Sequence, residues 1–169
     1  MTVSLYDIAA PLFRGQLSAL AAVLDKGAAF AESKKIDPAV LLNARLAPDM
    51  FALTRQVQIA TDIARGCIAR LAGVEPPKEA DGETSFADLK ARIQRTIDYI
   101  DGASPAALEG SEKREITLHQ RAGDITMSGM KYLTWFVIPN VGFHCATTYN
   151  ILRHNGVEIG KRDFLGPKD

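Results

Sequence analysis

The sequence predicts an all-α protein, a four-helix bundle with a small β-hairpin before the last helix. Long stretches of the 169-residue chain place apolar residues every three or four positions, the period of a helix with one buried face. One short stretch instead alternates with period two, as a half-buried strand does. No stretch approaches the ~18 consecutive apolar residues of a membrane span. Four such helices pack most simply as a bundle.

The first helix is predicted from about Ser4 into the low thirties. Ser4 and Asp7 have the spacing of a capping box, in which each side chain accepts a backbone N–H at the start of the helix. Pro11 falls early enough to bend the first turns without ending the helix. The apolar arc is wide, which suits a helix buried in a bundle. We expect Gly27 to interrupt it.

The second helix is predicted from near Pro48 to Gly73, a glycine suited to ending a helix. Before it, Asp37 followed by Pro38 is typical of the start of a short helical turn. The connection between the first two helices is long enough for a crossover. We expect one side of the second helix to be apolar and the other to face water, with Arg55, Gln58, Thr61, Asp62 and Arg65 on that wet side.

The third helix is predicted from Thr84 or Ser85 to Asp101, because apolar residues step by three or four throughout. The period then changes to two over residues 115–119 and again over 124–127, which predicts a β-hairpin. Two strands alone are only marginally stable, so we expect this hairpin to pack on a helix.

The last helix is predicted over residues 128–155, with Pro139 expected to kink or briefly break it. Asn155 followed by Gly156 is a strong stop signal. Residues 157–166 lack helical periodicity, and we expect an extended tail laid over the bundle.

Composition limits the class of protein. Lys and Arg total 20 and Asp and Glu total 20, so the formal net charge is zero, which argues against nucleic-acid binding. The length predicts one domain, residues 1–169. The start of the chain, Met1 onward, has no secretory signal pattern, so we expect a cytoplasmic protein with no membrane segment. Cys67 and Cys145 fall in apolar helical patterns, and we expect buried free thiols.

Among the three histidines, His144 is the best candidate for chemistry. We expect it to be a pocket-lining base, a hydrogen-bond donor or a single metal ligand; the alternative is a core histidine satisfied by its neighbours. His119, on the polar side of the hairpin, and His154, at a helix end, favour surface roles. A polar strip around His144 and an amide on the second helix give the candidate ligand-binding set: Gln56, Asn140, His144 and Thr148.

Other chemistries lack their motifs. The sequence has no Glu-x-x-His or His-Glu-x-x-His, so di-iron carboxylate and zinc-peptidase patterns are excluded. It has no Gly-x-Ser-x-Gly elbow and no Gly-x-Gly-x-x-Gly loop. Cys145 adjoins His144, but neighbours on a helix point about 100° apart, which disfavours a Cys–His dyad.

Two stretches carry a family resemblance. The run from Pro139 through His144 to Val157, continued by 159–166, looks like the C-terminal signature of an uncharacterised family, DUF1993. Asp49-Met50-Phe51 and residues 55–58 resemble it too. That family is similar to the DinB/YfiT-like superfamily of four-helix bundles, and the resemblance spans the whole chain.

The resemblance implies the fold and raises the question of a metal. Better-known members of the superfamily are metal-dependent enzymes, some of them thiol-dependent transferases or isomerases, with one histidine on the second helix and a His-x-x-x-His pair on the fourth. Here His144 stands for one ligand, position 148 is Thr148, and Gln56 occupies the region of the missing helix-two ligand. Zinc and nickel favour nitrogen and sulfur donors, so we expect no metal or other cofactor.

The leading hypothesis is therefore a DinB-like bundle that binds a small molecule in a polar pocket between the second and fourth helices. His144 is the candidate acid, base or ligand group. A metal-dependent transferase or hydrolase, using zinc or nickel, is the first alternative. A non-catalytic homodimeric interaction module is the second, because two-fold dimers are the commonest oligomers.

Overall fold

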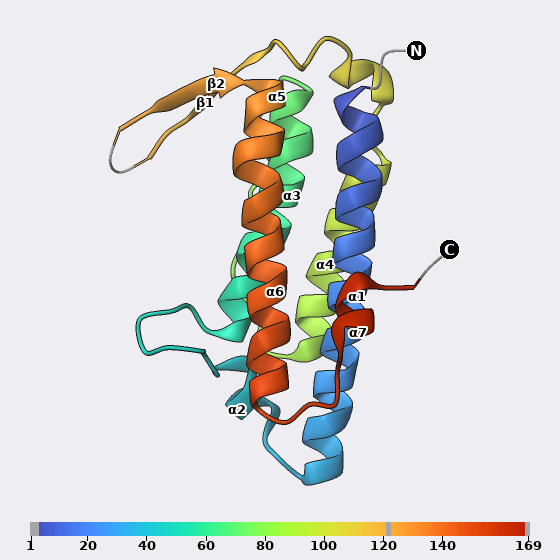
Figure 1. The fold of residues 1–169 in the computed structure, drawn as a ribbon, viewed down its shortest axis with the longest axis vertical. Coiled ribbons are helices and arrows are strands. Elements are labelled where there is room, and N and C mark those ends of the chain that lie inside the picture. Colours follow the sequence, from blue (N-terminus) through green and yellow to red (C-terminus); the bar gives the residue numbers. More distant parts are fainter. Residues whose placement is uncertain (1–3, 121–122, 168–169) are drawn as a thin grey trace.

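Four long helices run along one axis in the computed structural model (Figure 1). They are α1 (Leu5–Lys34), α3 (Leu53–Leu71), α4 (Phe86–Asp101) and α6 (Ile138–His154). The structure describes residues 4–120 and 123–167, so both ends of the predicted domain, including Met1, lie outside the described residues. The predicted class, an all-α bundle with a hairpin before the last helix, is confirmed.

Helix α1 has the predicted capping box: Asp7 N–H donates to Ser4 Oγ and Ser4 N–H donates to the Asp7 carboxylate. Gly27 does not interrupt the helix, contrary to expectation. An added Cβ at Gly27 would lie 3.0 Å from the Leu152 side chain and 3.3 Å from the Phe86 ring. The glycine therefore allows α4 and α6 to approach α1 closely.

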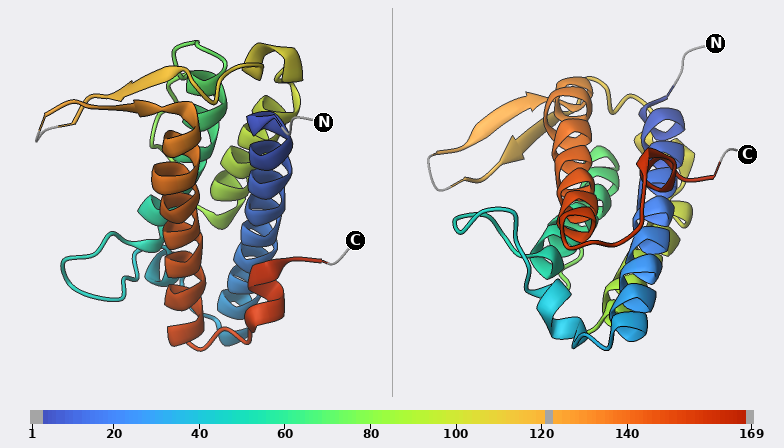
Figure 2. Two further views of the ribbon diagram at one scale, coloured as in Figure 1. Left: turned by 45° about the horizontal axis from the view of Figure 1, so that its top comes forward. Right: turned by 60° about the horizontal axis from the view of Figure 1, so that its bottom comes forward.

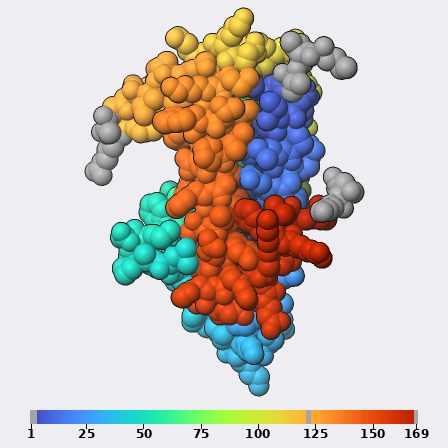
Figure 3. Space-filling view, in the orientation of Figure 1, coloured from blue at the N-terminus to red at the C-terminus, as the bar shows by residue number. Residues whose placement is uncertain are grey.

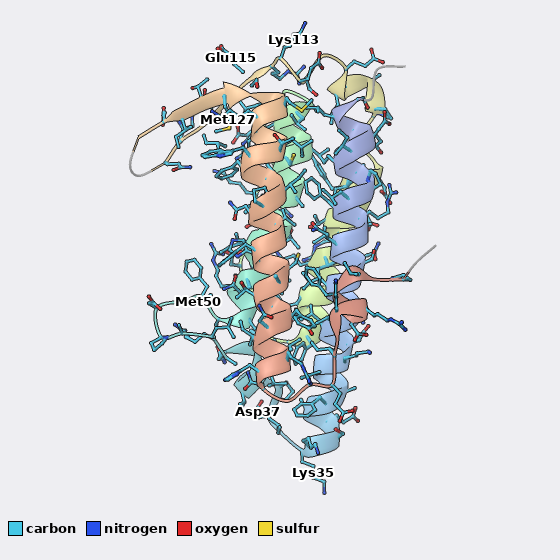
Figure 4. All side chains as sticks on the ribbon, in the orientation of Figure 1. Lys35, Asp37, Met50, Lys113, Glu115 and Met127 are labelled. Carbon is cyan, nitrogen blue, oxygen red and sulfur yellow. The ribbon has the colours of Figure 1, made fainter. Side chains whose placement is uncertain are left out.

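Helix α2 (Pro38–Leu42) is the predicted short turn, with the Asp37 carboxylate accepting from Ala39 N–H at 2.9 Å. Helix α3 begins at Leu53, later than predicted, and residues 43–52 before it form a loop. Figure 1 shows this α2–α3 loop projecting from the bundle, and in Figure 4 Met50 marks its outer part.

The crossover lies between α3 and α4, and not between the first two helices. Arg92 donates to Thr61, and further along both helices Ile68 and Tyr99 line one cavity, so α3 and α4 run parallel. Residues 72–85, the crossover segment, return the chain to the other end of the bundle. Helix α4 is antiparallel to α1, as the ion pair between Lys90 and Asp25 and the pair between Arg14 and Asp101 show.

The crossover segment buries the side of α3 that we expected to face water. Gln58, Thr61 and Arg65 are buried, and Arg92 of α4 is fully buried opposite them. Arginines from both helices meet carboxylates of α3 and of the crossover segment. We call this set the arginine cluster; it comprises Arg55, Arg65, Arg92, Arg95, Asp62, Glu79, Asp81 and Glu83.

The hairpin consists of β1 (Glu115–Leu118) and β2 (Ile125–Ser128), paired antiparallel with Glu115 opposite Ser128. Ile116, Leu118 and Met127 are buried, so one face packs on the bundle as predicted. The outer end of the hairpin projects from the bundle (Figure 2). Lys113 and Glu115 mark its base at one end of the bundle, and Lys35 lies at the opposite end (Figure 4).

The last helical segment changes its winding before Pro139. After α5 (Gly129–Lys131), residues Tyr132–Val137 form a π-helical stretch, η2, which continues into α6. Pro139 has no N–H to donate to a carbonyl one turn earlier, and the wider π turn absorbs this loss. A change of winding therefore takes the place of the expected break.

The tail after α6 is only partly extended. Residues 157–160 are extended, but α7 (Lys161–Leu165) is a short helix packed on α1. Its start is fixed by the Asp163 carboxylate, which accepts from Gly160 N–H at 2.7 Å, and by the ion pair between Asp163 and Lys26. Within the described ranges, no helix is long and apolar enough to cross a membrane.

Candidate functional site

His144 and Gln56 meet across the seam between α6 and α3. The distance from His144 Nδ1 to Gln56 Oε1 is 2.6 Å, although the two residues are 88 positions apart in the chain. Gln56 is buried, and the His144 side chain keeps an exposed fraction of 8%. The structure thus brings together two of the four residues of the predicted set.

The Gln56 amide determines which ring nitrogen of His144 carries the proton. Gln56 Nε2 donates to the backbone carbonyl of Phe51 at 3.0 Å, and a carbonyl can only accept. The amide oxygen must therefore face the ring, so His144 Nδ1–H is the donor in the bond between them. In the neutral ring, Nε2 then carries the lone pair, and it has no hydrogen-bond partner among residues 4–120 and 123–167.

The surroundings keep this imidazole neutral. Burial lowers the pKa of His144 below its usual value of 6.5, and the positive charge of Arg55 lowers it further. Arg55 itself is bound by Asp81 and by the Gln58 amide oxygen. A neutral imidazole held through Nδ1–H presents Nε2 as a base or as a hydrogen-bond acceptor.

Folding stability should respond to this lowered pKa. A group whose pKa is lower in the folded state stabilises the fold above its unfolded pKa, and this contribution is lost as pH falls through the folded value. We expect the wild-type protein to lose more stability than the His144→Gln variant between about pH 7 and about pH 5. Urea unfolding at both pH values measures the free energy of unfolding of each protein. If the two proteins lose the same amount of stability, the lowered pKa of His144 is contradicted.

One exposed aromatic ring lies directly beside the histidine. The Phe143 ring lies edge-on to the imidazole with centroids 5.3 Å apart, and its exposed fraction is 55%. Phe51, whose carbonyl orients Gln56, is also exposed. A buried polar pair and an exposed aromatic ring therefore lie next to each other at this point of the seam.

The other two predicted residues lie near His144 but make different contacts. Thr148 is buried, and its hydroxyl donates to the His144 backbone carbonyl at 3.0 Å, so it faces its own helix. Asn140 is half-buried, one turn before His144, and its amide has no partner among the described residues. Asn140 can therefore still reach a ligand, whereas Thr148 supports the helix.

Five cavities formed by the described residues have linings that do not include His144, and the largest of these five measures about 610 Å³. Cys145 lines a small one with Gln16, whose Oε1 is buried without a partner within the described ranges. Both cysteines are free and buried, as expected, and burial raises the pKa of Cys145 to about 12. These five cavities are therefore separate from the contact between His144 and Gln56.

The donors around His144 do not fit a transition metal. They are one imidazole, the Gln56 amide oxygen already bound to it, and the Thr148 hydroxyl turned to its own helix. Over residues 4–120 and 123–167, no three His, Cys, Asp or Glu side chains gather as ligands would. Zinc and nickel sites require more nitrogen or sulfur donors than this seam offers.

The remaining histidines have the predicted surface positions. His119 is exposed on the hairpin, and its Nδ1 lies 2.9 Å from Oδ2 of Asp124. His154 is exposed in the last turn of α6.

The fold is that of a DinB-like four-helix-bundle protein. The fold matches a crystal structure of a DinB family member protein from Shewanella denitrificans with a TM-score of 0.91 and 44% sequence identity, over 97% of this chain and 93% of that chain. The chain belongs to the family described as domain of unknown function DUF1993, whose model matches residues 5–165. A comparison with curated proteins finds no match.

Proposed function

We propose that this protein binds a small molecule at the α3–α6 seam, with Nε2 of His144 as the group that recognises it. One observation carries the proposal: Gln56, itself fixed by the Phe51 carbonyl, holds the imidazole with Nδ1–H bound and the Nε2 lone pair unused among the described residues. A buried amide that orients a neutral imidazole restricts the ring to one tautomer and one orientation, which is what a recognition or base group requires.

The contacts around the ring indicate the class of ligand. Nε2 of a neutral imidazole accepts a hydrogen bond, so the ligand carries an uncharged donor such as a hydroxyl or a thiol. Phe143 offers exposed apolar surface beside it, so the donor is attached to an apolar body. The Arg55 charge disfavours a cationic ligand. Asn140 supplies a second polar contact one turn away.

Binding of benzyl alcohol to the isotope-labelled protein tests the proposal. Nitrogen-15 spectra of the histidine rings report which nitrogen carries the proton and which one a ligand approaches. We expect the alcohol to shift the Nε2 signal of His144 in a saturable way. Benzyl methyl ether, which has the same apolar body and no donor, should bind at least about tenfold more weakly, the effect of one hydrogen bond of about 1.4 kcal/mol.

Two variants complete this test. His144→Gln should abolish the preference for the alcohol, whereas His154→Gln, a change at an exposed histidine of the same helix, should leave it unchanged. Equal affinity for alcohol and ether, or a preference that survives His144→Gln, would show that His144 is a core histidine and nothing more.

A second candidate function, a homodimeric interaction module, is favoured by the outer surface of the last helical segment. Figure 3 shows this segment running down the visible face of the molecule, uncovered along most of its length. Trp135 and Phe143 of this segment are 61% and 55% exposed. Exposed aromatic side chains of this kind are typical of protein interfaces. Sedimentation should show a dimer that Trp135→Glu dissociates; a wild-type monomer at high concentration would exclude this function.

A further inference from the structure

A groove of about 610 Å³ lies between the hairpin and α3, on the side of the bundle where β1 projects. Its walls come from α3, from residues 73–75, from residues 114–120 and from the η2 stretch. The volume falls within the range of roughly 300–1,000 Å³ that small-molecule sites occupy. His144 and Gln56 do not line it, so the groove is independent of the proposed site at the seam.

A positive group without a carboxylate partner lies in this groove. Arg70 Nη1 donates to the Tyr132 hydroxyl at 3.1 Å, and Arg70 forms no ion pair within the described ranges. By contrast, the arginines of the nearby cluster are each bound to at least one carboxylate. Arg114, which also lines the groove, donates to the Leu71 carbonyl at the end of α3. The groove thus presents guanidinium donors that the fold leaves available.

Gly66 makes the position of Arg70 possible. An added Cβ at Gly66 would lie 2.6 Å from Arg70 Nη1, so the guanidinium folds back over the glycine, one turn earlier on α3. This is where it reaches the Tyr132 hydroxyl. Burial raises the pKa of Tyr132 to about 12, so the hydroxyl keeps its proton and can donate it.

The rest of the lining combines apolar walls with the polar side chains of Thr117, His119 and Gln120 and with three carboxylates. Ile63 and Phe136 form one wall, and Ile116 and Leu118 of β1 form another. The carboxylate of Asp62 is bound by Arg65 and Arg92. Two other carboxylates of the lining, Glu75 and Glu115, are exposed to water.

We propose that this groove binds a small carboxylate with an apolar or aromatic body, held by Arg70 and the Tyr132 hydroxyl. A carboxylate accepts two parallel hydrogen bonds from a guanidinium, a geometry that discriminates it from neutral groups. Its body packs between Phe136, Ile63 and the buried face of β1. These walls select the shape of the acid that binds, and Arg70 selects a ligand with a negative charge.

Titration of the full, isotope-labelled chain with 3-phenylpropionate tests this proposal. We expect saturable shifts of the backbone amides of residues 73–75 and 115–119 and of the Arg70 Nε–H. The amide 3-phenylpropanamide has the same body without the charge and should bind at least about tenfold more weakly, since hydrogen bonds to charged groups contribute more than neutral ones. No saturable shift, or equal binding of acid and amide, would overturn the proposal.

Variants separate a built site from general attraction to a positive surface. Arg70→Met should weaken binding of the acid by roughly tenfold or more, whereas Arg162→Met, which removes an exposed arginine on α7, should leave it unchanged. Gly66→Ala keeps every charge but displaces the guanidinium, so it should weaken binding several-fold without lowering the melting temperature. Equal affinities of the Arg70 and Arg162 variants would show only non-specific binding of the anion.

Discussion

Replacing Arg92 by Met is expected to lower the free energy of unfolding by about 3 kcal/mol. Arg92 is fully buried, and its guanidinium donates to Thr61 Oγ1 at 2.9 Å, to the Ala80 carbonyl at 3.0 Å and to the Asp62 carboxylate at 2.7 Å. It also forms ion pairs with Glu83 and Asp81. Methionine fills similar space but has no hydrogen-bond donor, so each of these groups loses its bond to Arg92.

The expected loss lies at the low end of the range of about 3–5 kcal/mol for breaking a buried ion pair. Asp62 and Asp81 keep exposed fractions of 40% and 42%, so water can rehydrate them, whereas the almost fully buried Glu83 retains only Gln58 as a close donor. The Glu83 carboxylate and the Ala80 carbonyl therefore account for most of the cost.

Arg95 provides a matched control for this measurement. It binds Glu79 of the same cluster but is 56% exposed, and exposed pairs contribute only about 0–1 kcal/mol. Arg95→Met should therefore change the free energy of unfolding by less than about 1 kcal/mol. Urea unfolding followed by circular dichroism measures both. A loss in Arg92→Met no greater than in Arg95→Met would contradict a structural role for the buried guanidinium.

Arg92→Met should also release the crossover segment locally. Residues 72–85 are held mainly by the arginine cluster, and Lys78 lies exposed within them. Trypsin is expected to cut after Lys78 faster in this variant than in Arg95→Met. Local opening of a segment with few apolar contacts precedes global unfolding.

Replacing Gly129 by Ala is expected to cost about 3 kcal/mol, the upper end of the usual range for overpacking. An added Cβ would lie 2.0 Å from the Ser111 carbonyl oxygen and 3.0 Å from the Leu71 side chain. The oxygen belongs to the backbone, so it cannot turn away as a side chain does. Gly129 N–H also donates a hydrogen bond to the Arg114 carbonyl oxygen at 2.8 Å, which holds the chain segments around residues 114 and 129 together.

Gly15 is the control for this substitution. It lies in the interior of α1, is exposed, and has no atom within 4 Å of an added Cβ. Gly15→Ala should therefore raise the free energy of unfolding by about 0.5–1 kcal/mol, because alanine loses less conformational freedom in a helix. Thermal unfolding of both variants measures the contrast. If Gly129→Ala has the same melting temperature as the wild type, the close packing described at the base of the hairpin is wrong.

The helices and the hairpin could be predicted from sequence because they depend on local periodicity. Phe86, Leu89 and Ile93 step along one face, and the structure buries all three. The path of the chain could not be predicted in this way. The connection after the first helix is long enough for a crossover, but so is the one between α3 and α4, and side-chain periodicity does not say which of the two carries it.

The polar side of α3 shows a second limit. Arg65 has the pattern of a solvated residue, and it is buried only because α4 runs parallel to α3 and the crossover segment covers both. One sequence signal could have indicated this: acidic residues at 79, 81 and 83 in a connection, and arginines at 65, 92 and 95 on the helices it joins. Charge complementarity between a loop and two helices favours contact between them.

The candidate site was predictable as a set of residues and not as a geometry. Gln56 and His144 were identified from polar positions on two helices and from the family resemblance. Their 2.6 Å contact depends on how α3 and α6 pack, and the proton on Nδ1 depends on the Phe51 carbonyl. Arg70 and Tyr132 were missed, because 62 positions separate them and neither belongs to a motif.

The π turn at Tyr132–Val137 sets the rotational phase of everything that follows it. It accommodates one residue more than an α-helical turn, and each residue turns a helix by roughly 100°. If the same residues were wound as a regular α-helix, every residue after them would rotate by roughly 100°, and the His144 side chain would turn away from Gln56. The position from which His144 can reach Gln56 therefore depends on the winding of the helix two turns earlier.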